Sequence, residues 1–276
     1  MIRSTFLGWQ GTGGNVKKHS CIAALRFLCV TIITFLAMDA NAQADLPGTI
    51  TRVKPSVLIV GTFKATNSPR FALRGTGFVV GDGNLAVTNA HVIPEGADVD
   101  PDAKIAVQVR TGQNELQMRI ATVLEIDKTH DLALLQFEGA GVPKLALRDS
   151  DTVREGQAIA FMGFPIGGAL GFSPVTHRGM VSSVTTVSLP PGTARQLDAR
   201  TLRSLRDGNF EIFQLDATAY PGNSGGPMFD ADTGEVLGVI NMVFVKSTRE
   251  SALTSPSGIS YAIPSKFIAQ MLERRK

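Results

Sequence analysis

Cysteine is almost absent from this chain. The 276 residues include two cysteines, Cys21 and Cys29, and both lie within the first 42 residues. The remainder therefore cannot form a disulfide framework, use a cysteine nucleophile or build a cysteine-ligated zinc site. It also contains no HExxH pair of histidines, so we predict neither a metal ion nor a cofactor. Stability has to come from an apolar core, which a domain of about 230 residues can supply.

Excess charge is lacking outside the N-terminal segment. The formal net charge is +3, but residues 1–42 hold four basic residues against one acidic residue. This leaves 23 of the 27 basic and 23 of the 24 acidic residues in the remainder, whose net charge is zero. A basic isoelectric point that arises in one terminal segment does not describe a binding face. The composition thus predicts no nucleic-acid partner.

The apolar run Phe27–Met38 is shorter than a membrane-spanning helix, which needs about 20 residues. Basic residues at positions 17, 18 and 26 precede it, and a small-x-small sequence at 40–42 follows it. This order is typical of a secretory signal peptide that covers residues 1–42. We therefore expect an exported protein, periplasmic or secreted. The alternative is an uncleaved anchor starting near Cys21, which would attach the protein to a membrane.

Short apolar runs separated by turn residues follow from Asp45 onward, and they predict strands. A polar link at 148–152 divides them into two groups of comparable size. An all-β fold is therefore predicted, with one β half at about 45–148 and a second at about 153–264. Apolar and polar residues alternate in two neighbouring segments, 105–109 and 116–120. This alternation predicts a hairpin of two strands with one polar face. The other predicted strands are 57–60, 78–80, 85–87, 132–137, 158–161, 179–187, 210–217, 236–245 and 259–263.

Two segments depart from the strand pattern. Residues 191–209 are polar and arginine-rich, which predicts a long loop with either a solvated or a regulatory role. At the C-terminus, Ser265 is placed to cap a helix at 265–275. The apolar residues on one face of this helix are Ile268, Met271 and Leu272. We interpret the helix as a structural support.

Three short stretches hold residue types that nucleophilic hydrolysis requires. His91 lies in the sequence TNAHV after a predicted strand, and histidine can both accept and return a proton near neutral pH. Asp131 opens an apolar strand, where a carboxylate can orient an imidazole. Ser224 lies in PGNSGGP, where glycines let backbone N–H groups point at a developing oxyanion. Taken singly, each residue has an ordinary explanation, as a packed histidine, a strand-edge charge or a turn serine.

Taken together, the order and spacing of His91, Asp131 and Ser224 resemble the trypsin-like serine proteases. The local sequences TNAHV, DLALL and GNSGGP resemble the HtrA (Deg)-type branch of that superfamily. The flanking sequences GTGFVV, GFPIG, GMVSSV and GISYAIPS extend the resemblance from about Val53 to Ile268. It implies a chymotrypsin/trypsin-like fold of two antiparallel six-stranded Greek-key β-barrels with a C-terminal helix. It also implies polypeptide substrates and a site in the cleft between the barrels.

The resemblance gives each site residue a role. Ser224 would be the nucleophile, His91 the general base and acid, and Asp131 the group that orients the imidazole. The backbone N–H groups of Gly222 and Ser224 would form the oxyanion hole. Thr218 would form the neutral floor of the primary substrate pocket, so a preference for Lys or Arg is not expected. The candidates for a pocket wall, which are alternatively core strand positions, are Ile240, Asn241 and Met242.

Two features depart from related families. Asn223 stands where many trypsin-like zymogens carry an aspartate that pairs with a freshly cut N-terminus. We therefore predict no proteolytic activation beyond signal removal. No PDZ sequence follows the terminal helix, so peptide capture by strand addition in a PDZ groove is not expected from this chain. A homo-oligomer is compatible with the sequence but has no support in it.

Two functions stay open at this level. The first is an exported serine endopeptidase that cleaves unfolded or flexible protein segments through an acyl-enzyme. The second is a catalytically silent protease fold used as a binding or chaperone module. The intact set of His91, Asp131 and Ser224 favours the first.

Overall fold

The computed structural model describes residue 8 and residues 45–112, 115–165, 172–186, 210–241 and 259–275. Apart from Gly8, the predicted signal peptide lies outside these residues, as do the predicted loop at 191–209 and Met242. Within the described ranges, no helix is both long enough and apolar enough to cross a bilayer.

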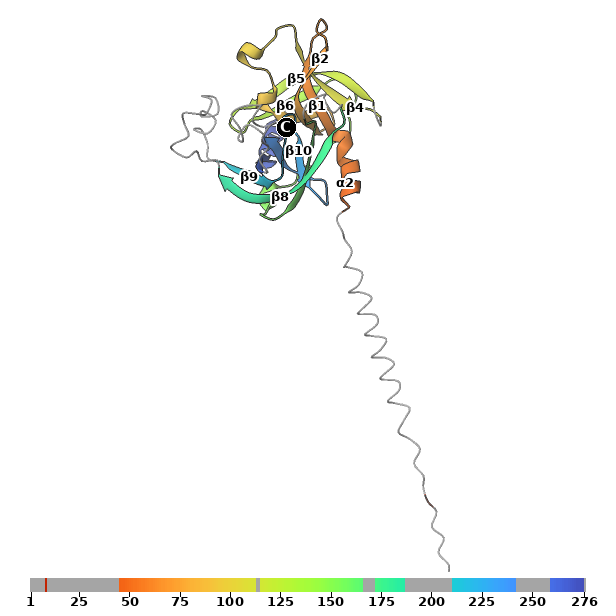
Figure 1. The fold of residues 1–276 in the computed structure, drawn as a ribbon, viewed down its shortest axis with the longest axis vertical. Coiled ribbons are helices and arrows are strands. Elements are labelled where there is room, and N and C mark those ends of the chain that lie inside the picture. The colour runs from red at the N-terminus through yellow and green to blue at the C-terminus, as the bar shows by residue number, and fades with distance from the viewer. Residues whose placement is uncertain are drawn as a thin grey trace, which may run out of the picture. The chain divides into compact units, whose positions relative to one another are not determined.

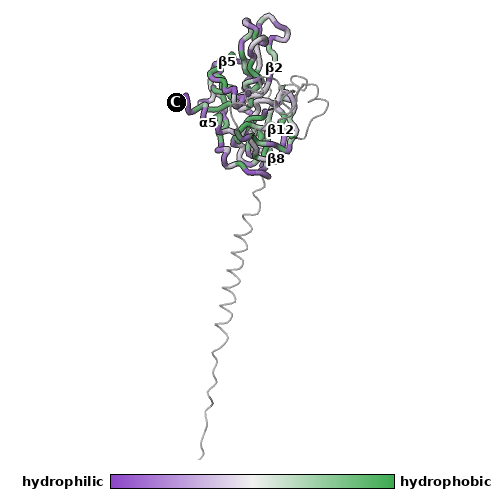
Figure 2. The backbone as a smooth tube through the Cα atoms, turned by 90° about the vertical axis from the view of Figure 1, so that its left-hand side faces the viewer, coloured by the Kyte–Doolittle hydropathy of each residue, from purple (hydrophilic) through white to green (hydrophobic). Residues whose placement is uncertain are grey.

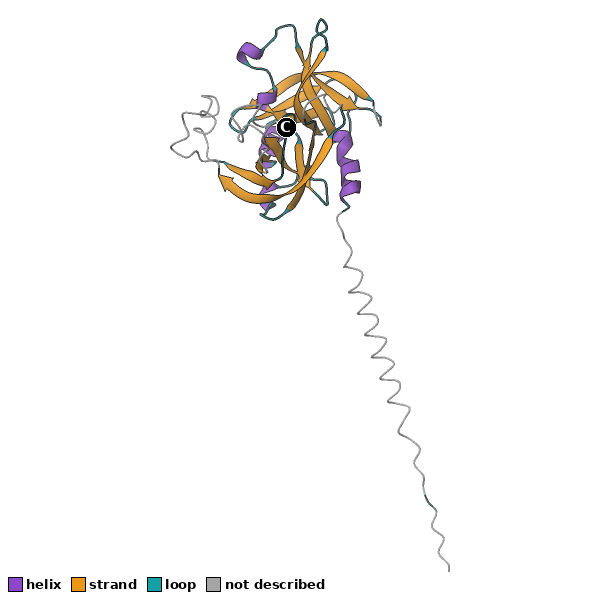
Figure 3. Cartoon of the chain, in the orientation of Figure 1, coloured by secondary structure: helices purple, strands orange, loops and turns teal. Residues whose placement is uncertain are grey.

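Twelve described strands close into two antiparallel barrels of six strands each, in the orders β1-β2-β3-β6-β5-β4 and β10-β11-β12-β9-β8-β7. The predicted all-β fold class is confirmed, and Figures 1 and 3 show the two barrels packed against each other. The first barrel consists of β1 (Val57–Phe63), β2 (Phe71–Val80), β3 (Leu85–Asn89), β4 (Lys104–Arg110), β5 (Leu116–Asp127) and β6 (Leu132–Phe137). The second consists of β7 (Ala158–Gly163), β8 (Val175–Thr186), β9 (Glu211–Asp216), β10 (Pro227–Asp230), β11 (Val236–Asn241) and β12 (Ile259–Pro264).

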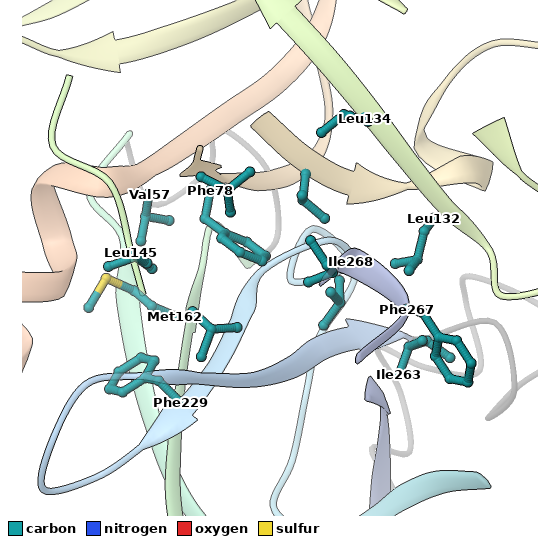
Figure 4. Packing of buried hydrophobic residues seen from close by; sticks show 14 of the residues in the cluster. Val57, Phe78, Leu132, Leu134, Leu145, Met162, Phe229, Ile263, Phe267 and Ile268 are labelled. Atoms are coloured by element: carbon teal, nitrogen blue, oxygen red, sulfur yellow. The ribbon is translucent and has the colours of Figure 1, made fainter. Parts of the chain in front are cut away.

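Several strands are buried on both faces, which explains their unbroken apolar sequences. In β1, Leu58 and Val60 point into the first barrel, whereas Val57 and Ile59 belong to a core shared by both barrels. Because successive side chains of a strand point to opposite faces, each such strand fills two cores at once. We call the shared cluster the inter-barrel core. Figure 4 shows part of it, contributed by Val57, Phe78, Leu132, Leu134, Leu145, Met162, Phe229, Ile263, Phe267 and Ile268.

A helix before the first strand was not expected from the sequence. Helix α2 (Leu46–Val53) begins after Asp45, whose side chain accepts a hydrogen bond from the Gly48 N–H at 3.0 Å. Its Thr49 hydroxyl donates to the Asp232 carbonyl at 2.9 Å, in the turn between β10 and β11. The helix therefore connects the start of the first barrel to the second barrel.

The C-terminal helix α5 (Lys266–Glu273) is confirmed, and Ser265 stands at its N-cap position, but the predicted capping bond of its side chain is not formed. The Ser265 hydroxyl donates to the Arg148 carbonyl at 2.7 Å and makes no capping bond. The Lys266 N–H donates instead to the Ser150 side chain at 3.1 Å. A tertiary contact with the link between the barrels thus replaces the local cap. This exchange ties the start of the helix to that link.

Helix α5 also contacts the first barrel. Phe267 stacks on His130, with ring centroids 3.7 Å apart, and Arg274 pairs with Glu125 of β5 at 2.5 Å. Its buried face contributes Ile268 and Met271 to the inter-barrel core. Beyond this face the chain end is hydrophilic (Figure 2). These contacts are those of a helix that supports the junction of the barrels.

Candidate active site

His91 and Asp131 form a direct pair where two neighbouring strands meet. Strands β3 and β6 are antiparallel with Asn89 opposite Leu132, so the turn after β3 lies beside the residue before β6. His91 Nδ1 is 2.6 Å from Asp131 Oδ2, and the His91 backbone N–H donates to Asp131 Oδ1 at 2.9 Å. An ionised carboxylate only accepts hydrogen bonds, so Nδ1 is the donor of this pair, and in a neutral imidazole Nε2 is then the acceptor.

Asp131 adopts an uncommon backbone conformation that its neighbours hold in place. Its φ is +53°, in the left-handed region, which aspartate tolerates better than most residues. Its carbonyl accepts from the Ala90 N–H and from Asn89 Nδ2, both at 3.0 Å. Its carboxylate accepts a further bond from Asn241 Nδ2, at 2.8 Å. Asn241 belongs to β11, so both barrels fix this carboxylate.

Ser224 lies in a tight turn directly before β10. The Asn223 N–H donates to the Tyr220 carbonyl and the Gly226 N–H to the Asn223 carbonyl, both at 2.9 Å. Gly222 has a φ of +103°, a conformation that a side chain would oppose. Ser224 is 6% exposed. Among the described residues, the N–H groups of Gly222 and Ser224 have no backbone acceptor.

Strand β11 contacts both the Ser224 turn and Asp131. The Gly225 N–H donates to the Ile240 carbonyl at 2.9 Å. The next residue, Asn241, donates its side chain to Asp131. Two consecutive residues of one strand therefore bring the serine-bearing and aspartate-bearing segments together.

A glycine of β2 lies where the histidine-bearing turn meets the serine-bearing turn. A Cβ on Gly75 would lie 2.7 Å from Val92 Cγ2 and 3.0 Å from the Ser224 carbonyl oxygen. Val92 directly follows His91 in the chain. A side chain at position 75 would therefore separate the turns that carry His91 and Ser224.

The side chain of Asn223 faces a half-buried histidine. Asn223 Nδ2 is 3.4 Å from His177 Nε2, and the His177 ring stacks on Phe161 with centroids 4.7 Å apart. Burial lowers the pKa of His177 below its ordinary value. The favoured neutral imidazole can accept a hydrogen bond from the amide, so Asn223 needs no charged partner here.

The comparisons with known proteins agree with this geometry. The pattern of the trypsin-like peptidase domain matches residues 75–239. The chain belongs to the trypsin-like peptidase family. Within it, the chain is an HtrA-type member by its similarity to relatives and solved structures.

The relatives are serine proteases by name. A probable periplasmic serine endoprotease, DegP-like, of Marinomonas sp. (strain MWYL1) is 33% identical over 73% of this chain and 35% of the relative. The mitochondrial serine protease HTRA2 of Drosophila pseudoobscura pseudoobscura is 32% identical over 76% of this chain and 40% of its own length. The chain thus spans well under half the length of the curated relatives it matches.

A solved structure of the HtrA-type protease AlgW with a tripeptide superposes with a TM-score of 0.60. It is 25% identical in sequence, and the match covers 83% of this chain and 62% of that one.

The residues predicted to line the substrate pocket have different surroundings. Ile240 is fully buried in the core of the second barrel. Asn241 is also fully buried, and its amide contacts Asp131. Thr218 is half-buried in the segment after β9, and Met242 lies outside the described residues. The pocket assignment stays a prediction of the family resemblance.

Two contacts of the trypsin-like site could not be found by sequence reasoning. The Asn241 amide reaches Asp131 from 110 positions away, and Thr76 of β2 donates its hydroxyl to the Gly222 carbonyl at 2.6 Å. From the sequence, Asn241 is a pocket-wall candidate but is not marked as a partner of Asp131, and Thr76 is not singled out. The signal that could have drawn attention to them is a polar residue at a buried position within an apolar run.

Proposed function

We propose that this chain is an exported serine endopeptidase that cleaves unfolded or flexible polypeptide segments through an acyl-enzyme. The single observation that carries the proposal is the His91–Asp131 pair at 2.6 Å, held at the junction of two barrels beside the Ser224 turn. The family membership supports it, because the matched relatives are named as serine proteases. The alternative, a silent binding or chaperone module, makes no use of the oriented imidazole.

In the proposed acylation step, Ser224 Oγ attacks the carbonyl carbon of the scissile peptide bond. His91 Nε2 takes the hydroxyl proton as the Oγ–C bond forms. His91 then gives that proton to the leaving amine as the C–N bond breaks. The Asp131 carboxylate stabilises the imidazolium during the step. A water molecule repeats the sequence in deacylation, which releases the carboxylic acid and regenerates the Ser224 hydroxyl.

The N–H groups of Gly222 and Ser224 would stabilise the oxyanion of the tetrahedral intermediate. Their proposed role is supported by the turn conformation, in which the neighbouring N–H groups of Asn223, Gly225 and Gly226 are each bonded to a carbonyl. Preorganised donors of this kind contribute about 3–4 kcal/mol each to transition-state stabilisation.

Activation and location also form part of the proposal. Asn223 meets the neutral His177 and carries no charge that a new N-terminus could pair with, so no activating cut within the protease domain is needed. The segment 1–42 has the composition of a signal peptide, and one relative is named periplasmic. We therefore assign the activity to the periplasm or the extracellular space, on polypeptide substrates.

Covalent labelling by a fluorophosphonate tests this proposal. Purified wild-type protein should be labelled at Ser224, and the Ser224→Ala variant should not. His91→Ala should slow labelling strongly while the fold, checked by circular dichroism, persists. Labelling that is absent from wild type, or that is equal in the Ser224→Ala variant, would reject the endopeptidase in favour of the binding module.

A further inference from the structure

Thr76 is a fully buried polar residue in the middle of strand β2, in the first barrel. Its backbone and side chain form four hydrogen bonds. Two of the four bonds go to the Ser224 turn of the second barrel. The Thr76 N–H donates to the Ser224 carbonyl at 2.9 Å, and the Thr76 hydroxyl donates to the Gly222 carbonyl at 2.6 Å.

These two bonds hold the peptide planes on either side of the Ser224 N–H. Because a peptide group is planar, fixing the Gly222 carbonyl fixes the whole 222–223 plane. Fixing the Ser224 carbonyl likewise fixes the 224–225 plane. The Ser224 N–H belongs to the 223–224 plane between them, and the Gly222 N–H belongs to the plane just before them. The same planes are also held within the second barrel, where the Asn223 N–H donates to the Tyr220 carbonyl and the Gly225 N–H to the Ile240 carbonyl. Thr76 adds the contacts from the first barrel, at the carbonyl side of the 222–223 and 224–225 planes.

The bond from the hydroxyl is needed because Gly222 has little intrinsic preference. Its φ of +103° is one of several conformations open to a residue without a Cβ. The Asn223 N–H holds one side of the 222–223 plane through the Tyr220 carbonyl, and the Gly222 carbonyl on the other side needs a partner of its own. The Thr76 hydroxyl is that partner, and together the two bonds favour one orientation of the plane.

The same hydroxyl connects the turn to strand β7. The Phe164 N–H, just after β7, donates to Thr76 Oγ1 at 3.1 Å. A Cβ on Gly163 would come within 3.0 Å of Thr76 Oγ1 and 2.7 Å of Asn223 Oδ1, so no side chain fits there. The hydroxyl thus accepts from one segment and donates to the other, which only a hydroxyl of this size can do.

We propose that Thr76 is the positioning residue of the oxyanion loop: its hydroxyl and N–H lock the Gly222 and Ser224 carbonyls so that the adjoining N–H groups face the oxyanion. The first barrel thereby sets the geometry of donors that belong to the second. This inference rests on the proposed endopeptidase function and adds a residue to it that does not touch the substrate.

The test compares Thr76→Val, which keeps the β-branched shape without the hydroxyl, with Thr76→Ser, which keeps the hydroxyl. The substrate is a dye-labelled, reduced and carboxymethylated α-lactalbumin, and kcat and KM are measured per folded molecule. Thr76→Val should lower kcat by about 100-fold, comparable to loss of one oxyanion donor, with KM nearly unchanged. The affinity for a peptide boronic acid, whose adduct carries the tetrahedral oxygen, should fall in parallel. Thr76→Ser should stay within about threefold of wild type in both.

Thr49→Val is the matched control. Thr49 is equally buried, and its hydroxyl also donates to a backbone carbonyl (Asp232, 2.9 Å) and accepts from a second group (Arg52, 2.8 Å), but away from the site. It should lose thermal stability while keeping wild-type kcat. If Thr76→Val does not fold, Thr76→Cys replaces it, because a thiol is only a weak hydrogen-bond donor. The kcat and boronic acid affinity of Thr76→Cys should be lower than those of wild type and Thr76→Ser, but the loss should be smaller than that expected for Thr76→Val.

Each outcome decides one question. The role of Thr76 would be overturned if Thr76→Val had the same kcat and boronic acid affinity as Thr76→Ser. It would likewise be overturned if Thr76→Cys had the values of wild type. In either case the proposed endopeptidase function would still stand. If Thr49→Val lost as much kcat as Thr76→Val, the loss would be explained by lower stability alone. That result would also overturn the positioning role of Thr76. Wild-type protein without Ser224-dependent hydrolysis would instead reject the proposed function itself.

Discussion

The carboxylate of Asp131 is fixed by donors from three directions. The His91 side chain, the His91 N–H and the Asn241 amide all reach it, at 2.6, 2.9 and 2.8 Å. The third of these comes from the other barrel. The orientation of the imidazole therefore depends on a residue outside the first barrel.

Replacement of Asn241 by alanine should lower kcat/KM by about 10- to 100-fold. A hydrogen bond to a charged group contributes about 1.5–3 kcal/mol, and its loss leaves Asp131 Oδ2 with the His91 side chain as its remaining partner among the described residues. Steady-state hydrolysis of the carboxymethylated substrate measures the effect. Asn241→Ser keeps a hydrogen-bond donor on a shorter side chain and should recover part of the loss. Wild-type kinetics in Asn241→Ala would show that this hydrogen bond does not contribute to catalysis.

His177 should make the stability of the fold depend on pH. Burial lowers the pKa of His177 in the folded state, so the unfolded chain takes up the proton first as the pH falls. The stabilisation is complete above the unfolded value of about 6.5 and decreases as the pH falls toward the lower folded value. Urea unfolding from pH 7.5 to 5 measures this. His177→Gln, which keeps an acceptor but does not titrate, should lose less stability over that range; an equal or larger loss would contradict the assignment.

At the scale of residues, the sequence supplied candidate site residues but not the contacts that support them. The turns that hold His91 and Ser224 carry their own glycines and small residues, so local sequence reveals them. The contacts of Asn241 and Thr76 join segments far apart in the chain, and no local pattern encodes which buried polar residue meets which partner. The three site roles and the pocket residues stay predictions until the labelling and kinetic tests are made.

At the scale of elements, helix α5 is the part whose removal should damage the junction most. Met271 is fully buried in the inter-barrel core, and Phe267 stacks on His130 beside Asp131. The ion pair of Arg274 with Glu125 is half-exposed and contributes at most about 1 kcal/mol. Apolar burial, rather than charge, therefore holds the helix.

The Met271→Ala variant should lower the free energy of unfolding by about 2–5 kcal/mol, because it removes buried methylene groups and leaves a cavity. Gln270→Ala is the control on the exposed side of the same helix and should change stability by less than about 0.5 kcal/mol. Chemical denaturation of both variants measures the difference. Equal midpoints for the two would show that α5 does not support the core.

Strands were predicted more completely than helices, for a physical reason. Runs such as Val57–Val60 and Leu132–Leu135 are apolar on both faces, so they predict strands without knowledge of the tertiary contacts. Helix α2 was missed because its stabilising contacts, such as Thr49 to Asp232, come from the second barrel. The predicted side-chain bond of Ser265 at the start of α5 is absent because its hydroxyl donates to the Arg148 carbonyl instead.

At the scale of the whole molecule, the site exists because two barrels share one core. His91 and Asp131 come from the first barrel, and Ser224 and Asn241 from the second. Two side-chain hydrogen bonds connect the barrels in opposite directions. Thr76 of the first barrel donates to the Gly222 carbonyl of the second, and Asn241 of the second donates to the Asp131 carboxylate of the first. The predicted fold class includes this arrangement, because it places the strands in two antiparallel barrels of six strands each.

We propose that the junction of the barrels hydrolyses peptide bonds of unfolded chains through Ser224. The most direct measurement is the rate of cleavage of carboxymethylated α-lactalbumin by wild type and by Ser224→Ala, with folded, disulfide-bonded α-lactalbumin as the comparison substrate. We expect wild type to cleave the unfolded chain much faster than the folded one, and Ser224→Ala to lose at least about 10³-fold in rate. Cleavage that persists in Ser224→Ala, or no cleavage by wild type, would contradict the account.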